Sequence, residues 1–341
     1  MPEPRFLVVR LGSLGDIIHT FPAVAALRES FPLAHIVWLT HPRWEFLVQS
    51  SGLASEVWTV DTRDLSSLRG VIRCLRQNSW TSAIDYQGLW KSAMLPFFGG
   101  VVRRIGFSSA TIREFGVPVL YSERVSTGKA HVSEQNGDLS LRAGAQHGTS
   151  PVSLRVPQKA QAELCSRLRA QSLDRYVVLS PDGGWRSKCW PAERFGAVCR
   201  KLHESLGLRC IVNAGPDEGE LAAALLRTSG DSAPLIHSGN LGELMALLRG
   251  AMCVVAGDTG PLHLAAALGT RTVALFGPTD PARNGPYRSE EPDASQPRDV
   301  VLRAPGVITT YKRGSEPHPS MLAITVEQVF DAVRLCIGVA K

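Results

Sequence analysis

The stretch CVVAGDTGPLHLAAALGTRTVALFGPTDP, residues 253–281, decides the fold of this chain. It opens with an apolar run typical of a buried strand, which ends in the polar, glycine-bearing loop 257–260. A helical stretch follows, and a second apolar run ends in the loop 277–281. Open α/β sheets bind ligands at loops that follow the carboxyl ends of their strands. The stretch therefore predicts a strand–helix–strand unit of a parallel sheet with a ligand site at its edge.

The start of the predicted helix is suited to an anion. Asp258 or Thr259 can cap it, and Pro261 fits its first turn. The backbone N–H groups from Gly260 onward and the positive end of the helix dipole then face the loop. His263 lies one turn further; packing in the core is its ordinary interpretation, and its place beside the loop favours a ligand contact. We expect this segment to bind a phosphorylated ligand.

The same alternation of strands and helices runs through the whole chain. Helical stretches at 17–30 and 65–77 separate apolar runs in the first half, and a polar, proline-punctuated stretch at 148–157 lies near the midpoint. The predicted strands are 6–10, 36–40, 57–60, 83–86, 176–180, 210–214, 234–237, 253–256 and 272–276. The pattern predicts an α/β protein with two Rossmann-like halves, each a doubly wound parallel sheet, that face one another across a cleft.

Composition is that of a globular protein with an anionic partner. The chain has 341 residues, 44% of them hydrophobic, and no apolar run near the ~20 residues that a membrane span needs. The amino terminus lacks a signal-peptide pattern, and the seven cysteines form no Cys-x-x-Cys pair, so we expect thiols in a reducing cytoplasm. The net charge of +6 favours nucleotides, phosphorylated glycolipid or a membrane surface. No basic stripe with interleaved aromatics indicates nucleic acid.

The first predicted strand ends in RLGSLGD, residues 10–16. Its glycines allow a tight turn, but the spacing differs from Gly-x-Gly-x-x-Gly, and no acidic residue ends the next strand, which argues against a dinucleotide site. Asp16 has two interpretations: an N-cap for its own helix, or a general base. Because capping uses acceptor capacity, one carboxylate would do both jobs poorly.

Two further loops carry candidate ligand contacts. In PDGGWRSKCWP, residues 181–191, Gly183 and Gly184 open the backbone, and Lys188 is either a ligand of a diphosphate or an ordinary surface lysine. Trp190 and Pro191 indicate an aromatic contact and a helix start.

In NAGPDEGE, residues 213–220, Glu218 or Glu220 can accept hydrogen bonds from ribose hydroxyls, or can simply favour a helix start. The pattern does not separate the two glutamates. We expect no metal site, because the sequence has no His-x-x-x-His, no Asp-x-Asp and no Cys/His cluster.

Arg69, Arg73 and Arg76 recur at helical spacing. A solvated helix face is the ordinary interpretation of such a row. Contact with anionic lipid, or with the phosphates of a lipid acceptor, is the alternative.

Several separated motifs together resemble the heptosyltransferases of lipopolysaccharide core synthesis, glycosyltransferase family nine. They are residues 10–22, 85–92, 188–191, 258–263 and 276–281. The resemblance implies a GT-B fold with an acceptor-binding domain at 1–155 and a domain that binds the nucleotide sugar at 156–324. It also implies that the last helix, 325–339, crosses back onto the first domain.

The resemblance implies roles for individual residues. Asp16 is similar to the family's catalytic base, and Lys188 to its diphosphate ligand. The implied donor contacts are Gly183, Gly184, Lys188, Glu218 or Glu220, Asp258, Thr259, Gly260 and His263. The implied acceptor contacts are Ser13, Gly15, Asp16, Gln87 and Lys91.

The implied reaction is inverting transfer of heptose from ADP-L-glycero-D-manno-heptose to an inner-core acceptor, either Kdo-lipid A or a heptosylated form of it. The resemblance implies no cofactor, since the ADP-sugar is a substrate. It also implies peripheral contact with the cytoplasmic face of the inner membrane.

Some positions depart from the family: glycines stand at 183 and 184 where hydroxyl residues are common, Cys189 replaces a histidine, and 309–321 lacks a cysteine-bearing pattern. Another nucleotide sugar, a nucleotide-sugar epimerase and a non-catalytic nucleotide-binding module remain as alternatives.

Overall fold

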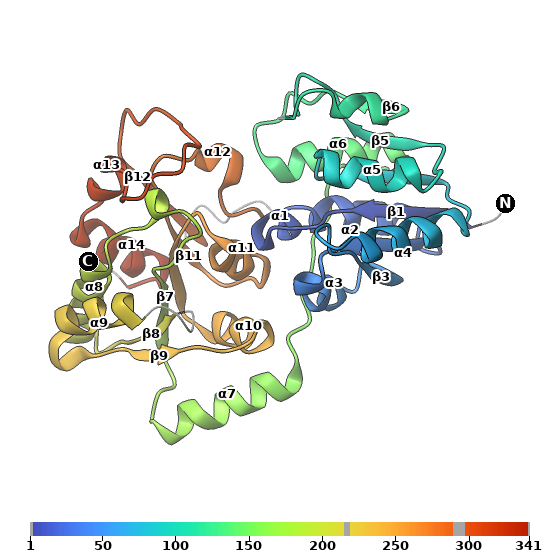
Figure 1. The fold of residues 1–341 in the computed structure, drawn as a ribbon. Coiled ribbons are helices and arrows are strands. Elements are labelled where there is room, and N and C mark those ends of the chain that lie inside the picture. Colours follow the sequence, from blue (N-terminus) through green and yellow to red (C-terminus); the bar gives the residue numbers. More distant parts are fainter. Residues whose placement is uncertain (1–2, 113, 215–218, 289–296, 340–341) are drawn as a thin grey trace. The chain divides into compact units, whose positions relative to one another are not determined.

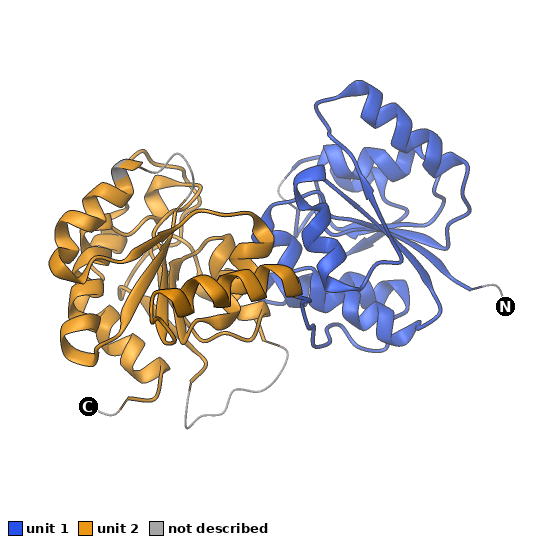
Figure 2. Ribbon diagram, turned by 90° about the horizontal axis from the view of Figure 1, so that it is seen from below, with its two compact units in different colours: residues 1–155 blue, residues 156–341 orange. Residues whose placement is uncertain are grey.

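The structure, a computed structural model, describes residues 3–112, 114–214, 219–288 and 297–339. The chain divides into two compact units, Met1–Arg155 and Val156–Lys341 (Figure 2). Each unit is built on one six-stranded sheet whose paired strands all run parallel (Figure 1). The predicted class, α/β with two doubly wound parallel sheets, is confirmed.

The first unit has the strand order β3-β2-β1-β4-β5-β6. Its strands are β1 (Arg5–Val9), β2 (His35–Thr40), β3 (Glu56–Thr59), β4 (Ser82–Asp85), β5 (Arg104–Phe107) and β6 (Glu123–Val125). Strand β1, at the centre of the sheet, is almost wholly apolar, as expected for a strand covered on both faces. Val9 at its end lies opposite Leu39 on one side and Asp85 on the other.

Helices cover this sheet in two groups, with α2 packed against α6 and α4 packed against α5. The helices are α1 (Leu14–Ile18), α2 (Phe21–Ser30), α3 (Glu45–Ser51), α4 (Leu65–Arg76), α5 (Trp90–Phe98) and α6 (Val132–Ala143). The single helix expected at 17–30 is therefore broken into α1 and α2. Pro22 occupies the first turn of α2, where its missing N–H costs nothing, so it marks a helix start rather than an interior position.

The second unit repeats the same order as β12-β11-β10-β7-β8-β9. Its strands are β7 (Tyr176–Ser180), β8 (Arg209–Asn213), β9 (Leu235–His237), β10 (Cys253–Gly257), β11 (Thr272–Phe276) and β12 (Asp299–Arg303). Its helices are α7 (Gln158–Ala170), α8 (Ala192–Leu206), α9 (Gly219–Ser229), α10 (Leu241–Gly250), α11 (Gly260–Ala267), α12 (Pro281–Asn284), α13 (Pro319–Leu322) and α14 (Val326–Cys336). Helices α8, α9 and α14 lie on one face of the sheet, and α10 and α11 on the other (Figure 1).

Each sheet has one topological switch point, at which the side where successive strands are added reverses. In the first unit successive strands are added outward from β1 on one side and from β4 on the other, and in the second unit from β7 and β10. Such a switch point is where loops diverge to opposite faces and leave room for a ligand. The loops that carry Asp16 and Gln87 flank the first switch point, and those that carry Lys188 and Asp258 flank the second.

The apolar pattern predicted the central strands better than the edges. Strands β7 and β11 have the predicted bounds, and the other seven predicted strands lie within one residue of the observed bounds at each end. Three strands were missed: β5, β6 and β12, with the sequences RIGF, ERV and DVVLR. β6 and β12 are edge strands, and all three carry charged residues, so their sequences lack the apolar run of a central strand.

The last helix, which was expected to pack on the first domain, contributes to the core of the second unit. Helix α14 contacts α8, β10, β11 and β12, all in the second unit. Its Val329, Phe330, Val333 and Cys336 are buried in the apolar core of that unit. An amphipathic helix packs where its apolar stripe finds a matching surface, and here the second sheet supplies it.

No helix in the described part of the chain is both long enough and apolar enough to cross a membrane.

Trp190 ties α8 to the carboxyl-terminal segment of the second unit. Its ring is buried at 2% exposure, packs edge-on against Phe195 at 4.9 Å, and its Nε1 donates to the Ile324 carbonyl at 3.0 Å. We predict that Trp190→Ala lowers the free energy of unfolding of this unit by about 3–5 kcal/mol in urea titrations. Trp185→Ala, at a half-buried position of the same unit, is the control; an equal loss there would contradict the prediction.

Candidate functional site

Asp16 lies in the first turn of α1, immediately after the carboxyl end of β1. Ser13 is the N-cap of this helix, and the Asp16 Oδ2 atom accepts hydrogen bonds from the Ser13 N–H at 3.0 Å and from its hydroxyl at 2.9 Å. Asp16 is thus the third helical residue of a capping box, and the expectation that it is the N-cap itself is wrong. Capping engages one carboxylate oxygen, and the side chain as a whole is 46% exposed.

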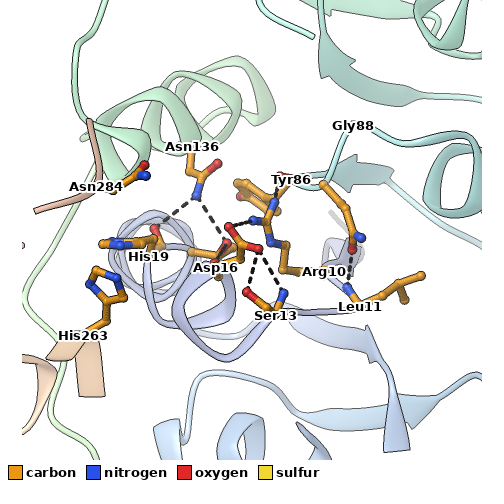
Figure 3. A network of polar contacts seen from close by, with 12 residues as sticks. Arg10, Leu11, Ser13, Asp16, His19, Tyr86, Gly88, Asn136, His263 and Asn284 are labelled. Atoms are coloured by element: carbon orange, nitrogen blue, oxygen red, sulfur yellow. Dashed lines mark hydrogen bonds and ion pairs between the residues drawn. The ribbon is translucent and has the colours of Figure 1, made fainter. Parts of the chain in front are cut away.

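Arg10 engages the other oxygen of the same carboxylate. Its Nη2 lies 2.7 Å from Asp16 Oδ1, and its Nη1 donates to the carbonyl of Tyr86 (Figure 3). The guanidinium is nearly buried, at 7% exposure, so its orientation is set by the fold. Charge-assisted hydrogen bonds from two sides therefore hold the Asp16 carboxylate in one position. Arg10 was not among the site residues expected from the sequence; a charged residue that ends a buried apolar strand is the signal that could have indicated it.

The loop after β4 is organised by a buried carboxylate. Asp85 accepts hydrogen bonds from the Tyr121 hydroxyl at 2.7 Å, the Ser92 hydroxyl at 2.8 Å, and the N–H groups of Gln87 at 2.9 Å and Gly88 at 3.2 Å. Burial raises the pKa of the Asp85 carboxyl, and these hydrogen bonds oppose the rise. The residue therefore holds the loop in shape, a role that its place in a motif did not reveal.

The two loops at this switch point are joined directly. Gln87 Oε1 accepts a hydrogen bond from the Leu11 N–H at 2.7 Å (Figure 3). On the far side of α1, Asn136 of α6 donates to the His19 carbonyl at 3.1 Å. Hydrogen bonds thus hold both the loop before α1 and the residue that ends this helix.

The expected acceptor residues therefore fall into two groups. Ser13, Asp16 and Gln87 belong to one bonded cluster at the carboxyl edge of the sheet. Gly15 is buried inside α1, and Lys91 is exposed in the first turn of α5. The structure gives neither of the last two residues a bond to the cluster.

In the second unit, a buried carboxylate lies between two basic side chains. Asp258 Oδ2 is 2.6 Å from Lys188 Nζ, and Asp258 Oδ1 is 3.3 Å from His263 Nε2. The side chains of Asp258 and His263 are each 5% exposed, and that of Lys188 is 15% exposed. Strands β7 and β10 are neighbours, with Ser180 opposite Ala256, so the loops that follow them bring these groups together.

The charge state of Asp258 follows from this arrangement. Burial alone would raise its pKa, but the hydrogen bond and charge of His263 and the charge of Lys188 outweigh burial, so the pKa lies well below its usual range. Asp258 is an anion at neutral pH. Lys188 is thus neither a loose surface lysine nor a cation without a counter-charge.

The start of α11 offers donors to a ligand. Thr259, not Asp258, is the N-cap, and its side chain makes no capping hydrogen bond. Its Oγ1 is buried and has no hydrogen-bond partner among the described residues. A buried hydroxyl at the amino end of a helix is a suitable donor to a phosphate oxygen.

Gly183 and Gly184 differ in what surrounds them. A Cβ at Gly183 would lie 3.2 Å from Thr259 Cγ2 and 3.3 Å from Cys189 Sγ, whereas one at Gly184 would meet nothing within 4 Å. Of these two glycines, only Gly183 is closely packed, so that a side chain there would crowd its neighbours.

A further cation lies at this edge of the second unit. The Trp185 ring centroid is 4.4 Å from Lys188 Nζ and 4.9 Å from Arg313 Cζ, both within cation–π range. Arg313 was not among the site residues expected from the sequence, because it lies in an irregular segment with no periodic pattern.

The structure does not decide between Glu218 and Glu220 as the expected ribose contact. Glu218 lies outside the described residues, and Glu220 is in the first turn of α9, where the structure does not describe its side chain. Across the described ranges, no three His, Cys, Asp or Glu side chains gather as they would to hold a metal ion.

Asp258 should make the second unit sensitive to acid. Because its pKa is lower in the folded than in the unfolded protein, its stabilising effect is complete above the unfolded pKa, about 4, and is lost as pH falls further. We predict that Asp258→Asn costs about 3 kcal/mol of unfolding free energy at pH 7, since it leaves Lys188 without its counter-charge. In urea titrations the difference from the wild type should shrink below about pH 4; a difference independent of pH would refute this account.

Comparison with known proteins identifies the family. The family model described as glycosyltransferase family 9 (heptosyltransferase) matches residues 68–297. Lipopolysaccharide heptosyltransferase 1 of Pseudomonas aeruginosa is 27% identical over 83% of this chain and 81% of its own length.

Solved structures share the fold along the whole chain. A family 9 glycosyl transferase from Veillonella parvula matches with a TM-score of 0.82 at 20% identity, covering 100% of this chain and 99% of its own. The Escherichia coli heptosyltransferase WaaC, solved with ADP, matches with a TM-score of 0.76 at 23% identity, covering 96% of this chain and 98% of its own. With the family model matching well over half of its length, this chain belongs to glycosyltransferase family 9, the heptosyltransferases.

Proposed function

We propose that this glycosyltransferase moves heptose from ADP-L-glycero-D-manno-heptose to an inner-core acceptor of lipopolysaccharide, with inversion at the anomeric carbon. The observation that carries the proposal is the Lys188–Asp258–His263 cluster at the start of α11, in a chain that belongs to the heptosyltransferase family. Relatives support the choice of sugar and acceptor: heptosyltransferase WaaC has been solved with ADP and with ADP-2-deoxy-2-fluoro heptose, and the sequence relatives include lipopolysaccharide heptosyltransferases.

The second unit supplies the donor site in this proposal. The Lys188 ammonium, the Thr259 hydroxyl and the N–H groups at the start of α11 would receive the diphosphate, and His263 would hold Asp258 in place. The ion pair with Asp258 holds the Lys188 ammonium beside the start of α11 before a ligand arrives. Preorganised positive groups stabilise charge that develops on a leaving diphosphate. One of Glu218 and Glu220 would receive the ribose hydroxyls.

The first unit supplies the base. The Asp16 carboxylate, held by Arg10 and Ser13, would take the proton from the acceptor hydroxyl as that oxygen bonds to the anomeric carbon. The bond from the anomeric carbon to the diphosphate breaks on the opposite face, through an oxocarbenium-like transition state as in glycoside hydrolysis, and ADP leaves. Ser13, Gln87 and, one turn further, Lys91 would contact the acceptor.

The roles of the two parts of the chain follow from this division. Residues 1–155 would bind the acceptor, and residues 156–324 would bind the nucleotide sugar. Helix α14 belongs to the core of the second unit and would stabilise the donor site. Water must be excluded during transfer, because an activated sugar is otherwise hydrolysed.

Removal of the Asp16 carboxylate should abolish transfer and spare donor binding. We predict that Asp16→Asn lowers kcat by about 10²–10⁴-fold, the usual loss of a general base, with an unchanged Kd for ADP. Ser13→Ala, which removes one hydrogen bond to the same carboxylate and keeps the base, should cost much less. Turnover of Asp16→Asn at the wild-type rate would remove Asp16 from the mechanism.

Removal of the Lys188 charge should weaken the donor site. We predict that Lys188→Gln raises the Kd for ADP by about 10–100-fold in calorimetric titrations, the loss of a charge-assisted hydrogen bond. Lys201→Gln should leave the Kd unchanged; Lys201 is a half-exposed residue of α8 in the same unit and pairs with Glu327 of α14. Equal Kd values for Lys188→Gln and the wild type would show that the diphosphate does not meet Lys188.

The overall activity is tested by ADP release from ADP-heptose with and without deacylated Kdo-lipid A. Release that requires the acceptor, together with the glycosylated product, supports the proposal. Conversion of the donor without acceptor would indicate an epimerase, and ADP binding without turnover on any acceptor would indicate a nucleotide-binding module.

A further inference from the structure

Helix α5 is mostly apolar on the face that it turns to solvent, where Lys91 is its one exposed charged residue. Its buried side is formed by Ser92, Ala93, Leu95 and Pro96. Its other side carries the large apolar residues Trp90, Met94, Phe97 and Phe98, which are 40–45% exposed and recur at the i, i+4, i+7, i+8 spacing of one helical stripe. A helix of a water-soluble surface normally turns charged or polar residues outward. This face of α5 therefore requires an explanation beyond packing within the unit.

The exposed face continues beyond the helix. Val102, Phe115 and Val119 are 83%, 98% and 66% exposed. Trp90 Nε1 donates to the Phe115 carbonyl at 3.2 Å, so the loop that carries Phe115 is joined to the start of α5. We call the following residues together the α5 patch: Trp90, Met94, Phe97, Phe98, Val102, Phe115 and Val119. Contiguous exposed apolar patches of this kind mark interaction sites.

Positive charge borders the α5 patch. Helix α4 packs against α5 and carries Arg69, Arg73 and Arg76, all exposed. Arg76 Nε donates to the Phe98 carbonyl at 2.9 Å, which places this guanidinium at the edge of the patch. The guanidinium carbon of Arg104 lies 5.3 Å from the centre of the Phe97 ring. Neither α4 nor α5 contains an acidic residue.

We propose that the α5 patch docks on the surface of a bilayer that contains anionic phospholipid, with the aromatic residues in the headgroup region and the α4 arginines on lipid phosphates. Aromatic rings favour the membrane interface, and each arginine near an anionic surface adds to binding. Charge distinguishes this occupant from a second copy of the chain. A two-fold symmetric contact through the α5 patch would set its arginine rims against each other, and like charges across an interface are unfavourable.

The docking surface also deepens the proposed function. Gln87 and Lys91, the expected acceptor contacts, lie just before α5 and in its first turn. A bilayer on the α5 patch would therefore be close to the acceptor edge of the first unit, where a lipid-linked sugar could arrive from the membrane. This consequence rests on the proposed function, whereas the binding of vesicles does not.

The test is sedimentation of the purified full chain with vesicles. One set contains phosphatidylglycerol with phosphatidylethanolamine, and the other contains phosphatidylcholine alone. We expect binding to the anionic set, weakened by salt, and a loss of about tenfold or more in partitioning for Met94→Ser/Phe97→Ser. The matched control is Leu322→Ser/Leu335→Ser, two residues of the second unit with 43% and 54% exposure, which should bind as the wild type does.

Two control measurements separate a loss of membrane binding from a loss of folding or of activity. Thermal unfolding shows that both double variants are folded, and ADP release with the deacylated, water-soluble acceptor should be the same for them and the wild type. Absence of binding to anionic vesicles, or equal losses in the two double variants, would overturn the proposal. So would a wild-type dimer in analytical ultracentrifugation that Met94→Ser/Phe97→Ser converts to a monomer with vesicle binding unchanged. Failure of ADP release in the wild type, with vesicle binding intact, would count against the proposed function alone.

Discussion

The parallel pairing of β1 with β4, and of β7 with β10, is the constraint on which both candidate sites depend. At these two places the crossovers on either side leave in opposite directions, so the loops that follow the paired strands approach one another at the sheet edge. The pairing brings Arg10 and Asp16 beside the Tyr86–Gln87 loop in the first unit. In the second unit it brings Lys188 to Asp258, although 70 residues separate them in the chain. The Lys188–Asp258 pair therefore results from strand order, as does the hydrogen bond by which the Tyr86 carbonyl orients Arg10.

Three aspartates at these edges show how surroundings assign different tasks to one type of side chain. Burial raises the pKa of Asp85, the neutral donors around it oppose the rise, and their hydrogen bonds suit this carboxyl to holding a loop. Asp258 is equally buried but lies between Lys188 and His263, so it stays charged. Asp16 is half exposed, bound by Arg10 on one oxygen and Ser13 on the other. Only this third carboxylate combines a fixed orientation with access for an incoming hydroxyl.

Much of the fold could be predicted from the sequence, because a strand covered on both faces is a continuous apolar run and a parallel pair requires a helix between its members. The strands β7 and β11 show this directly. The edge strands β6 and β12 were missed, since edge strands tolerate charge and bury less, and so was the short strand β5 beside β6. Helix α14 was detected, but its docking surface was not. An amphipathic stripe specifies that a helix packs, and only the complementary stripe elsewhere in the chain specifies where.

For the candidate site, the sequence by itself determined which loops carry chemistry, because glycine, proline and short polar residues at strand ends report local backbone geometry. It placed Asp16, Lys188, Asp258 and Thr259 at such ends without knowledge of their partners. Tertiary structure alone decided that the Tyr86 carbonyl orients Arg10 toward Asp16, and that the buried Asp258 stays charged beside Lys188. The physical reason is that hydrogen bonds, burial and charge pairing act through space between segments far apart in the chain, whereas sequence patterns report only the conformation of neighbours.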